Sequence, residues 1–327
     1  MRILVTGAAG FIGSHLCDEL LRRGHEVKGL DNLRNGKLAN LSEAISYEGF
    51  RFLEGDILDP SACERAVEDC DLVYHLACLG VRHSLHSPLE NHRVNAEGSL
   101  NVLEASHKLG VRKFFYISTS EVYGKTVHFP IRETDPTIPL TVYGSSKLAG
   151  EHYTHSYNEC YGLDSTVLRI FNNYGPRAHY EGDCGEILPR SIVRILYGEN
   201  PVIFGDGSVT RDFFFVKDTA TLLSDLAERQ GLTGLTINIG TGEEISMKHL
   251  LEKVITLMPE GKNIDYLEAR PADVPRLWVD NSFMKSILGE RPIMPFEQGL
   301  KETIAYYREL MKTRELNTEI TLLNWQK

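Results

Sequence analysis

The first thirteen residues of the chain constrain its fold more than any other segment. An apolar run with two β-branched residues at 2–6 predicts a buried strand, and glycines follow at positions 7, 10 and 13. With this spacing, Gly7 permits a tight turn, Gly10 lets backbone amides approach a pyrophosphate, and Gly13 lets the next helix pack on the strand. The helix then directs the positive end of its dipole at the phosphates. The segment therefore predicts a dinucleotide-binding turn, although a glycine triplet by itself also suits an ordinary strand-to-helix turn.

The end of the second predicted strand, residues 26–30, indicates which dinucleotide binds. Asp31 follows this strand, eighteen residues after Gly13. A carboxylate at this position can accept hydrogen bonds from both hydroxyls of the adenosine ribose, and it would repel a 2′-phosphate. Asp31 therefore predicts NAD rather than NADP as the cofactor. Arg34, three residues further on, weakens this inference a little.

Apolar strands and amphipathic helices alternate over the first half of the chain. We predict strands at 2–6, 26–30, 51–54, 72–76, 113–118 and 165–170, and helices at 11–23, 60–68 and 89–109. A further predicted helix contains Tyr143 and Lys147 and ends at about residue 161. This alternation is typical of a doubly wound parallel sheet. The predicted fold is α/β: a Rossmann-type domain over residues 1–171, to which a segment near 213–240 returns, with a smaller mixed α/β substrate lobe over 172–315 and a tail over 316–327.

Composition excludes some classes of function. The net charge of −10 disfavours nonspecific nucleic-acid binding, and no stretch approaches the roughly 18–20 apolar residues of a membrane span. Because the first strand begins at residue 2, we expect no signal peptide, a cytoplasmic protein, and six reduced cysteines without a C-x-x-C pair. Histidines at 83, 86 and 92 lack a recognised ligand spacing, so we expect a polar loop and helix start here, and no metal site.

Two segments carry side chains suited to acid–base chemistry. Tyr143 and Lys147 lie four residues apart, on one face of a helix, where an ammonium group can lower the pKa of the phenol from about 10 toward neutrality. Tyr143 would then be a general base. In S-T-S-E-V-Y-G at 118–124, Thr119 could bind the same substrate oxygen, and Glu121 could be a second acid or base. A solvated helix face and a helix N-cap are the structural alternatives.

With these motifs, the chain resembles an extended short-chain dehydrogenase/reductase of the NAD-dependent nucleotide-sugar epimerase/dehydratase group. The resemblance covers about residues 1–312. It rests on T-G-A-A-G-F-I-G at 6–13, Asp31, D-I at 56–57, H-L-A at 75–77, Asn95, the segment at 118–124, Y-x-x-x-K at 143–147, R-I-F-N-N-Y-G-P-R at 169–177 and T-R-D-F at 210–213. It implies NAD that is recycled within each turnover, a nucleoside diphosphate sugar as substrate, with UDP as the default, and a homodimer built from the helices around 89–109 and 143–161.

The resemblance also implies site residues. Thr119, Glu121, Tyr143 and Lys147 would be catalytic. The cofactor would contact Gly7, Gly10, Phe11, Ile12, Gly13, Asp31, Asn32, Asp56, Ile57, Leu76, Ala77, Asn95, Ser118, Tyr143 and Lys147. The substrate would contact Arg82, Asn172, Arg211 and Arg270. A guanidinium group can donate two hydrogen bonds to phosphate oxygens, so Arg211 and Arg270 would bind the diphosphate. Either of these two arginines alone also suits a surface ion pair.

The resemblance leaves the second chemical step open. In this group Tyr143 would remove the proton of the carbon-4 hydroxyl while NAD takes the hydride. The T-S-E pattern resembles GDP-mannose 4,6-dehydratases and UDP-glucuronate decarboxylases, so we expect Glu121 to act next at carbon 5. Arg82 in a Gly-Val-Arg loop, as in hexuronate epimerases, favours the alternative, a UDP-hexose or UDP-hexuronate 4-epimerase. A reductase that releases its cofactor and an inactive NAD-sensing protein are further alternatives.

Overall fold

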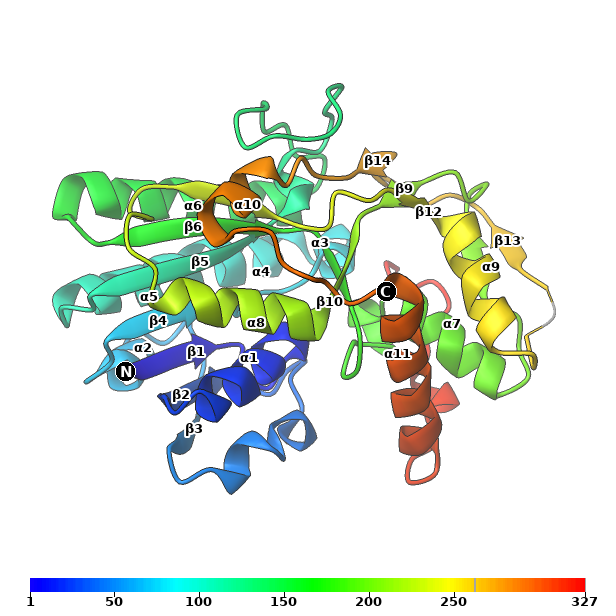
Figure 1. The fold of residues 1–327 in the computed structure, drawn as a ribbon, viewed down its shortest axis with the longest axis horizontal. Helices are drawn as coiled ribbons and strands as arrows, with labels where there is room; N and C mark the ends of the chain where they lie inside the picture. The colour runs from blue at the N-terminus through cyan, green and yellow to red at the C-terminus, as the bar shows by residue number, and fades with distance from the viewer. Residues whose placement is uncertain (262, 327) are drawn as a thin grey trace.

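In the computed structural model, which describes residues 1–261 and 263–326, a seven-stranded parallel sheet fills the left part of Figure 1. The strand order is β11-β6-β5-β4-β1-β2-β3. The strands are β1 (Arg2–Thr6), β2 (Glu26–Asp31), β3 (Phe50–Glu54), β4 (Leu72–His75), β5 (Lys113–Thr119), β6 (Ser165–Ile170) and β11 (Thr236–Ile239). The chain order reverses between β1 and β4, where doubly wound sheets place their ligands. The predicted doubly wound sheet is confirmed.

Helices cover both faces of this sheet. On one face α1 (Phe11–Arg22) packs against α8 (Val216–Ala227), and on the other α5 (Gly98–Lys108) packs against α2 (Pro60–Val67) and α6 (Val142–Tyr161). Every residue of the central strand β5 is buried. Coverage on both faces explains why the strands read as continuous apolar runs in place of an alternating pattern.

The predicted helix at 89–109 is wrong in its details. The chain forms α4 (Pro88–His92), a π-helical turn over Arg93–Glu97, and then α5. Within the turn, the Asn95 side chain donates to the carbonyl of Leu79 (3.0 Å) and accepts from its amide (2.8 Å). The helix thus widens locally where the Asn95 side chain forms hydrogen bonds with the loop after β4. The hydrophobic periodicity of the sequence does not reveal this arrangement. The same loop, predicted without a helix, contains α3 (Val81–His86).

The smaller lobe lies to the right in Figure 1 and has its own apolar core. Its helices are α7 (Ile187–Leu196), α9 (Met247–Leu257) and α11 (Phe296–Met311). Short sheets pair β7 (Asn172–Tyr174) with β10 (Phe213–Phe215), β8 (Val202–Phe204) with β13 (Asp265–Leu267), and β9 (Thr210–Arg211) with β12 (Ile245–Ser246) and β14 (Arg276–Leu277). The segment 213–239 passes back through α8 to β11, and α10 (Ser282–Leu288) packs against β11, so the two lobes are interleaved.

The C-terminal tail packs on this lobe. Trp325 meets Phe204 edge to face, with ring centroids 4.6 Å apart. Arg190 of α7 donates hydrogen bonds to the carbonyls of Thr321 (2.8 Å) and Leu322 (2.9 Å). The tail is therefore held by the buried Trp325 side chain and by hydrogen bonds from the Arg190 side chain to its backbone carbonyls.

We predict that Trp325→Ala releases the tail. A buried tryptophan contributes about 3 kcal/mol to packing, and Leu322 and Leu323 beside it are exposed. Hydrogen exchange and protease cleavage of residues 316–326 should rise, while NAD binding is unchanged. Leu323→Ala is the matched control, since Leu323 is 38% exposed. Equal protection in the wild type and the Trp325→Ala variant would contradict the packing described.

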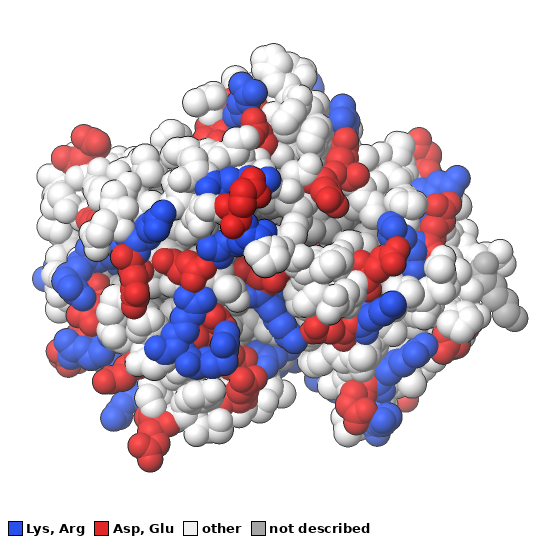
Figure 2. All heavy atoms as spheres, in the orientation of Figure 1, with Lys and Arg blue, Asp and Glu red and all other residues white. Residues whose placement is uncertain are grey.

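No helix in the described part of the chain is both long and apolar enough to span a membrane. Basic and acidic side chains of the described residues are interspersed on the face drawn in Figure 2.

Candidate active site

A cavity of about 400 Å³ lies where β1, β4, β5 and β6 end, between the two lobes. The larger domain contributes the glycine turn and the ends of β4 and β5, and the smaller lobe contributes residues from β9 and from the segment around Arg270. Predicted site residues on its wall are Gly7, Gly10, Phe11, Ile12, Gly13, Leu76, Ala77, Arg82, Ser118, Thr119, Glu121, Tyr143, Lys147, Asn172, Arg211 and Arg270. Residues far apart in sequence thus share one cavity.

The glycine turn has the geometry expected of a phosphate-binding turn. Gly7 has a φ of +71°, and a Cβ there would lie 2.9 Å from the amide nitrogen of Ala77. A Cβ at Gly13 would overlap the carbonyl oxygen of Gly7. Glycine is therefore required at both positions, and the backbone between them stays open to the cavity.

A second, smaller cavity of about 140 Å³ adjoins the first and shares Gly7 and Ala77 with it. Asp31, Asn32, Asp56 and Ile57 line it. Asp31 accepts hydrogen bonds from the amides of Ala9 (3.0 Å) and Leu33 (2.8 Å), one at each carboxylate oxygen. Each oxygen keeps a lone pair for a ribose hydroxyl, so the pair of cavities fits an adenine dinucleotide.

Thr119 and Tyr143 enter the cavity from neighbouring elements. β5 ends at Thr119, whose hydroxyl accepts from the amide of Glu121 (3.2 Å). The Thr141 hydroxyl accepts from the amide of Gly144 (3.1 Å) and so starts α6 just before Tyr143. Thr119 and Tyr143 both line the cavity, and the Thr119 side chain acts to lower the pKa of the Tyr143 phenol. The hydroxyl and the phenol can therefore hold one substrate oxygen between them.

Burial opposes the expected effect of Lys147 on the pKa of Tyr143. Burial raises the pKa of Tyr143 well above its ordinary value, and the Thr119 side chain opposes this shift. Burial also lowers the pKa of Lys147, whose ammonium lies 4.3 Å from the centre of the Tyr116 ring. The effect of burial on the pKa of Tyr143 is larger than the effect of the nearby Lys147 charge. The i, i+4 spacing predicts only the second effect.

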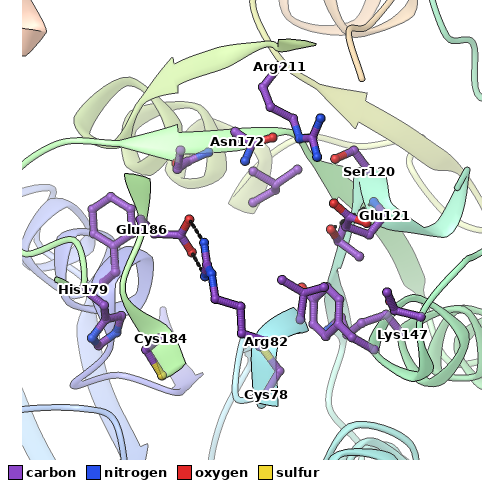
Figure 3. Close-up of a pocket in the computed structure, with 18 of the residues that line it drawn as sticks. Cys78, Arg82, Ser120, Glu121, Lys147, Asn172, His179, Cys184, Glu186 and Arg211 are labelled. Carbon is purple, nitrogen blue, oxygen red and sulfur yellow. Dashed lines mark hydrogen bonds and ion pairs between the residues drawn. The ribbon is translucent and has the colours of Figure 1, made fainter. Parts of the chain in front are cut away.

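Glu121 faces the cavity as a protonatable group. Figure 3 shows its carboxyl on the same side of the cavity as Lys147 and across from Glu186. Burial raises the pKa of Glu121, although the positive charge of Arg211 opposes the shift. An enclosed carboxyl with a raised pKa is a candidate acid or base.

Arginines of the smaller lobe surround the other end of the cavity. Arg211 donates to Asp273 (2.8 Å) and to the carbonyl of Val274 (2.7 Å). Arg270 lies over the Phe204 ring, 4.5 Å from its centre. Burial, aided by repulsion from other arginines, lowers the pKa of Arg270 to about 9. A diphosphate here would relieve that repulsion and satisfy guanidinium donors.

Arg82 is already paired within the cavity. Its guanidinium donates to both oxygens of Glu186 at 3.3 and 3.2 Å, as the dashed lines in Figure 3 show. Glu186 precedes α7 and is separated from Arg82 by 104 positions, so no local spacing could have identified this partner. His179, Asp183 and Cys184 of the same loop also line the cavity and are absent from the predicted site residues.

Asn95 and Ser118 act differently from simple contacts. Asn95 is fully buried, does not line either cavity, and holds the Leu79 loop through the hydrogen bonds described above. Ser118 lines the larger cavity but donates its hydroxyl to Glu151. Both residues shape the cofactor side of the cavity through the elements they fasten.

A buried ion pair fastens β6 and α6 to the end of β5. The Arg169 guanidinium on β6 donates to Glu151 on α6 at 2.7, 3.0 and 3.2 Å, and to the Tyr123 hydroxyl at 2.8 Å. Arg169 and Glu151 are 7% and 2% exposed. Because Glu151 also accepts from Ser118, the pair ties β6, α6 and the end of β5 together.

We predict that Arg169→Ala destabilises the protein by about 3–5 kcal/mol, because it leaves the Glu151 charge buried and unpaired. Urea unfolding followed by circular dichroism measures the loss. Arg132→Ala is the matched control: Arg132 pairs with Asp280 at 3.0 Å on the surface, and this variant should lose less than about 1 kcal/mol. Equal losses in the two variants would refute the supporting role of the buried pair.

Comparison with known proteins identifies the family. The model of the NAD dependent epimerase/dehydratase family matches residues 3–240. The chain belongs to this family. It is 35% identical to the UDP-glucose 4-epimerase of Mycolicibacterium smegmatis over 94% of this chain and 99% of that protein. It is 32% identical to the UDP-glucuronic acid decarboxylase 1 of Xenopus tropicalis over 98% of this chain and 75% of that protein.

A solved structure extends the comparison to a third activity. The dTDP-glucose 4,6-dehydratase DesIV from Streptomyces venezuelae, in complex with NAD, superposes with a TM-score of 0.91 and 29% identity over 96% of this chain and 99% of that one. NAD is therefore the cofactor of the family member described here, as Asp31 predicts, and the ligand class is a nucleotide sugar. Epimerases, a decarboxylase and a dehydratase all share the fold, so the fold does not decide between these activities.

Proposed function

We propose that this enzyme oxidises the sugar of a UDP-hexose at carbon 4 and then acts at carbon 5, with Glu121 as the acid and base of the second step. The observation that carries the proposal is the enclosed Glu121 carboxyl, two residues from Thr119 on the cavity wall, with a raised pKa. A plain 4-epimerisation has no step that requires a carboxyl at this place.

The first step needs a base and an orienting donor. Tyr143 takes the proton of the carbon-4 hydroxyl, and Thr119 binds the same oxygen. NAD, when held by the glycine turn and Asp31, would supply the hydride acceptor for carbon 4, and its positive ring would favour the phenolate of Tyr143. Lys147 holds a positive charge on the same side of the cavity. Arg211 and Arg270 bind the diphosphate and fix the sugar relative to these groups.

The second step follows from the acidity that a 4-keto group gives to carbon 5. Glu121 removes the carbon-5 proton and the hydroxyl leaves carbon 6 as water once protonated. The hydride taken from carbon 4 returns to carbon 6, and a proton returns to carbon 5. One nucleotide hexose thus gives one 4-keto-6-deoxy sugar and one water. With a hexuronate, carbon dioxide would leave carbon 5 instead, and a proton would take its place.

The charges in the cavity favour a neutral hexose over a hexuronate. A sugar carboxylate would meet Glu121 and Glu186, while Arg82 is already occupied by Glu186. Since like charges in an enclosed site repel strongly, this arrangement favours dehydration over decarboxylation.

The second candidate is a UDP-hexose or UDP-hexuronate 4-epimerase. It is supported by the likeness to the Mycolicibacterium smegmatis enzyme, and the Gly80-Val81-Arg82 segment motivated it from sequence. In this case the 4-keto sugar would turn in the cavity and take its hydride back on the other face. Glu121 would then only bind the sugar.

Product mass separates the candidates. The purified enzyme should be incubated with UDP-glucose, UDP-glucuronate, UDP-N-acetylglucosamine, GDP-mannose and dTDP-glucose, and the products analysed by mass spectrometry and proton NMR. We expect a neutral hexose to lose the mass of one water. A product of unchanged mass with inverted carbon 4 would establish the epimerase, and loss of carbon dioxide from UDP-glucuronate would establish the decarboxylase.

We also propose that two copies associate through α5 and α6. Leu100 on α5 and Tyr161 on α6 are 37% and 56% exposed, and the rings of His107 of α5 and Tyr161 lie 5.0 Å apart, so these side chains share one outer face. Exposed apolar side chains on adjoining helices are typical of subunit contacts. Light scattering during size exclusion should give the mass of a dimer, and a monomer would refute this proposal.

A further inference from the structure

We propose that His83, His86 and Asp183 form a binding site for a divalent transition metal ion such as Zn²⁺, which fastens α3 to the loop before α7. One ligand atom from each of the three side chains lies within 4.8 Å of the others. His83 and His86 belong to α3, and Asp183 belongs to the 3₁₀ turn Gly182–Cys184. The sequence predicted no metal here because Asp183 lies about a hundred residues beyond the histidines.

His83 supplies an observation that points directly to a ligand. The side chain is buried, and its Nδ1 has no hydrogen-bond partner among the described residues. A buried imidazole nitrogen left unpaired costs about 1–3 kcal/mol. Its Nε2 lies 3.2 Å from a carboxylate oxygen of Glu90. A histidine that ligates a metal through one nitrogen typically donates the other N–H to such a carboxylate.

His86 and Asp183 face each other from the two elements. The His86 Nε2 lies 2.9 Å from a carboxylate oxygen of Asp183, and its Nδ1 lies 3.0 Å from the Ser87 hydroxyl. The rings of His83 and His86 are 4.9 Å apart, as expected of residues three positions apart on a helix. Two imidazoles and one carboxylate are a ligand set suited to Zn²⁺, with a fourth position left for water or another side chain.

The nearest positive charge does not exclude a cation. An Arg34 guanidinium nitrogen lies 3.2 Å from the His83 Nε2, but Arg34 forms an ion pair with Glu90, which offsets its charge. A His86–Asp183 ion pair without metal would explain those two side chains. It leaves the buried Nδ1 of His83 unexplained, and this atom decides between the two interpretations.

The consequence for the enzyme is a fixed cavity wall. Arg82 precedes His83 on α3, and Asp183 and Cys184 line the cavity from the opposite loop. A metal ion would hold these two segments together across the cavity rim. Its role would be to position the wall that carries Arg82, without contact to the reacting atoms, so the site is independent of which second step the enzyme performs.

The test uses the full-length, untagged protein, stripped of metal with a chelator and dialysed. Titration with Co²⁺, followed by visible absorption, and with Zn²⁺, followed by calorimetry, should each show one site per chain. Asp183→Asn and His86→Ala should weaken binding by at least about tenfold. His92→Ala is the matched control, because His92 is exposed on α4 and should bind as the wild type does.

Melting curves and NAD binding establish that each variant is folded, and Asp183→Asn is the less disruptive change because Asp183 is only partly buried. Zn²⁺ should raise the melting temperature of the wild type and of His92→Ala, but not that of Asp183→Asn. A wild-type protein that binds no Co²⁺ or Zn²⁺, or binding by Asp183→Asn that equals the wild type, would overturn the proposed site.

Discussion

Replacing Tyr143 with phenylalanine is expected to lower kcat by about 10²–10⁴-fold, the usual contribution of a positioned general base. The change removes one oxygen atom and leaves the ring in the enclosed position it occupies beside Thr119. Binding of the nucleotide sugar should change little, because Arg211 and Arg270, the proposed diphosphate contacts, lie at the other end of the cavity. Steady-state turnover and calorimetric binding of the substrate measure the two effects.

Tyr153→Phe is the control for this variant, since Tyr153 lies on the same helix and packs against the core of the larger domain. It should retain turnover within about threefold of the wild type, which is the ordinary scatter of a change that removes no catalytic group. If Tyr143→Phe also turned over within this range, Tyr143 would not be the base, and the proposed first step would fail.

Glu121→Gln is expected to lower kcat by about 10²–10⁴-fold for a different reason. The amide fills the same space but cannot take the carbon-5 proton, so the first oxidation proceeds and the second step stops. The 4-keto nucleotide sugar should therefore accumulate, which mass spectrometry detects as the loss of two hydrogen atoms. Glu243→Gln, an exposed change, is the control and should leave turnover unaltered.

The pH dependence follows from the same carboxyl. Burial raises the pKa of Glu121, so its carboxylate form is lost as the pH falls through that raised pKa. Turnover by the wild type should therefore decrease on the acid side, at a higher pH than an exposed glutamate would require. The acid limb should be absent from the residual activity of Glu121→Gln. An identical pH profile for both proteins would show that Glu121 is neither acid nor base.

The sequence was sufficient for the sheet and for the cofactor turn. Both follow from local properties: apolar runs give buried strands, and the glycine spacing at 7, 10 and 13 is required by close backbone contacts that the structure shows at Gly7 and Gly13. Asp31 likewise lies at a fixed distance along a regular fold. These features need no knowledge of contacts between distant parts of the chain.

The cavity wall could not be predicted in the same way. Glu186 pairs with Arg82 and Asp183 meets His86 only because a loop of the smaller lobe folds across α3. Enclosure also reverses the local expectation for Tyr143, whose pKa depends on burial that no helical spacing reports. The clasp of Asn95 on Leu79 similarly replaces a regular helix by a π-helical turn. In each case a tertiary contact overrides the local pattern.

Solvent deuterium tests most directly whether the enzyme acts at carbon 5. The reaction should be run in D₂O with the nucleotide sugar that is turned over, and the product examined by proton NMR and mass spectrometry. Removal of the carbon-5 proton by Glu121 and its later replacement predict one deuterium at carbon 5, in a product lighter by one water or one carbon dioxide than the same substrate. A product that has an inverted carbon 4 and carries no deuterium at carbon 5 would contradict this account.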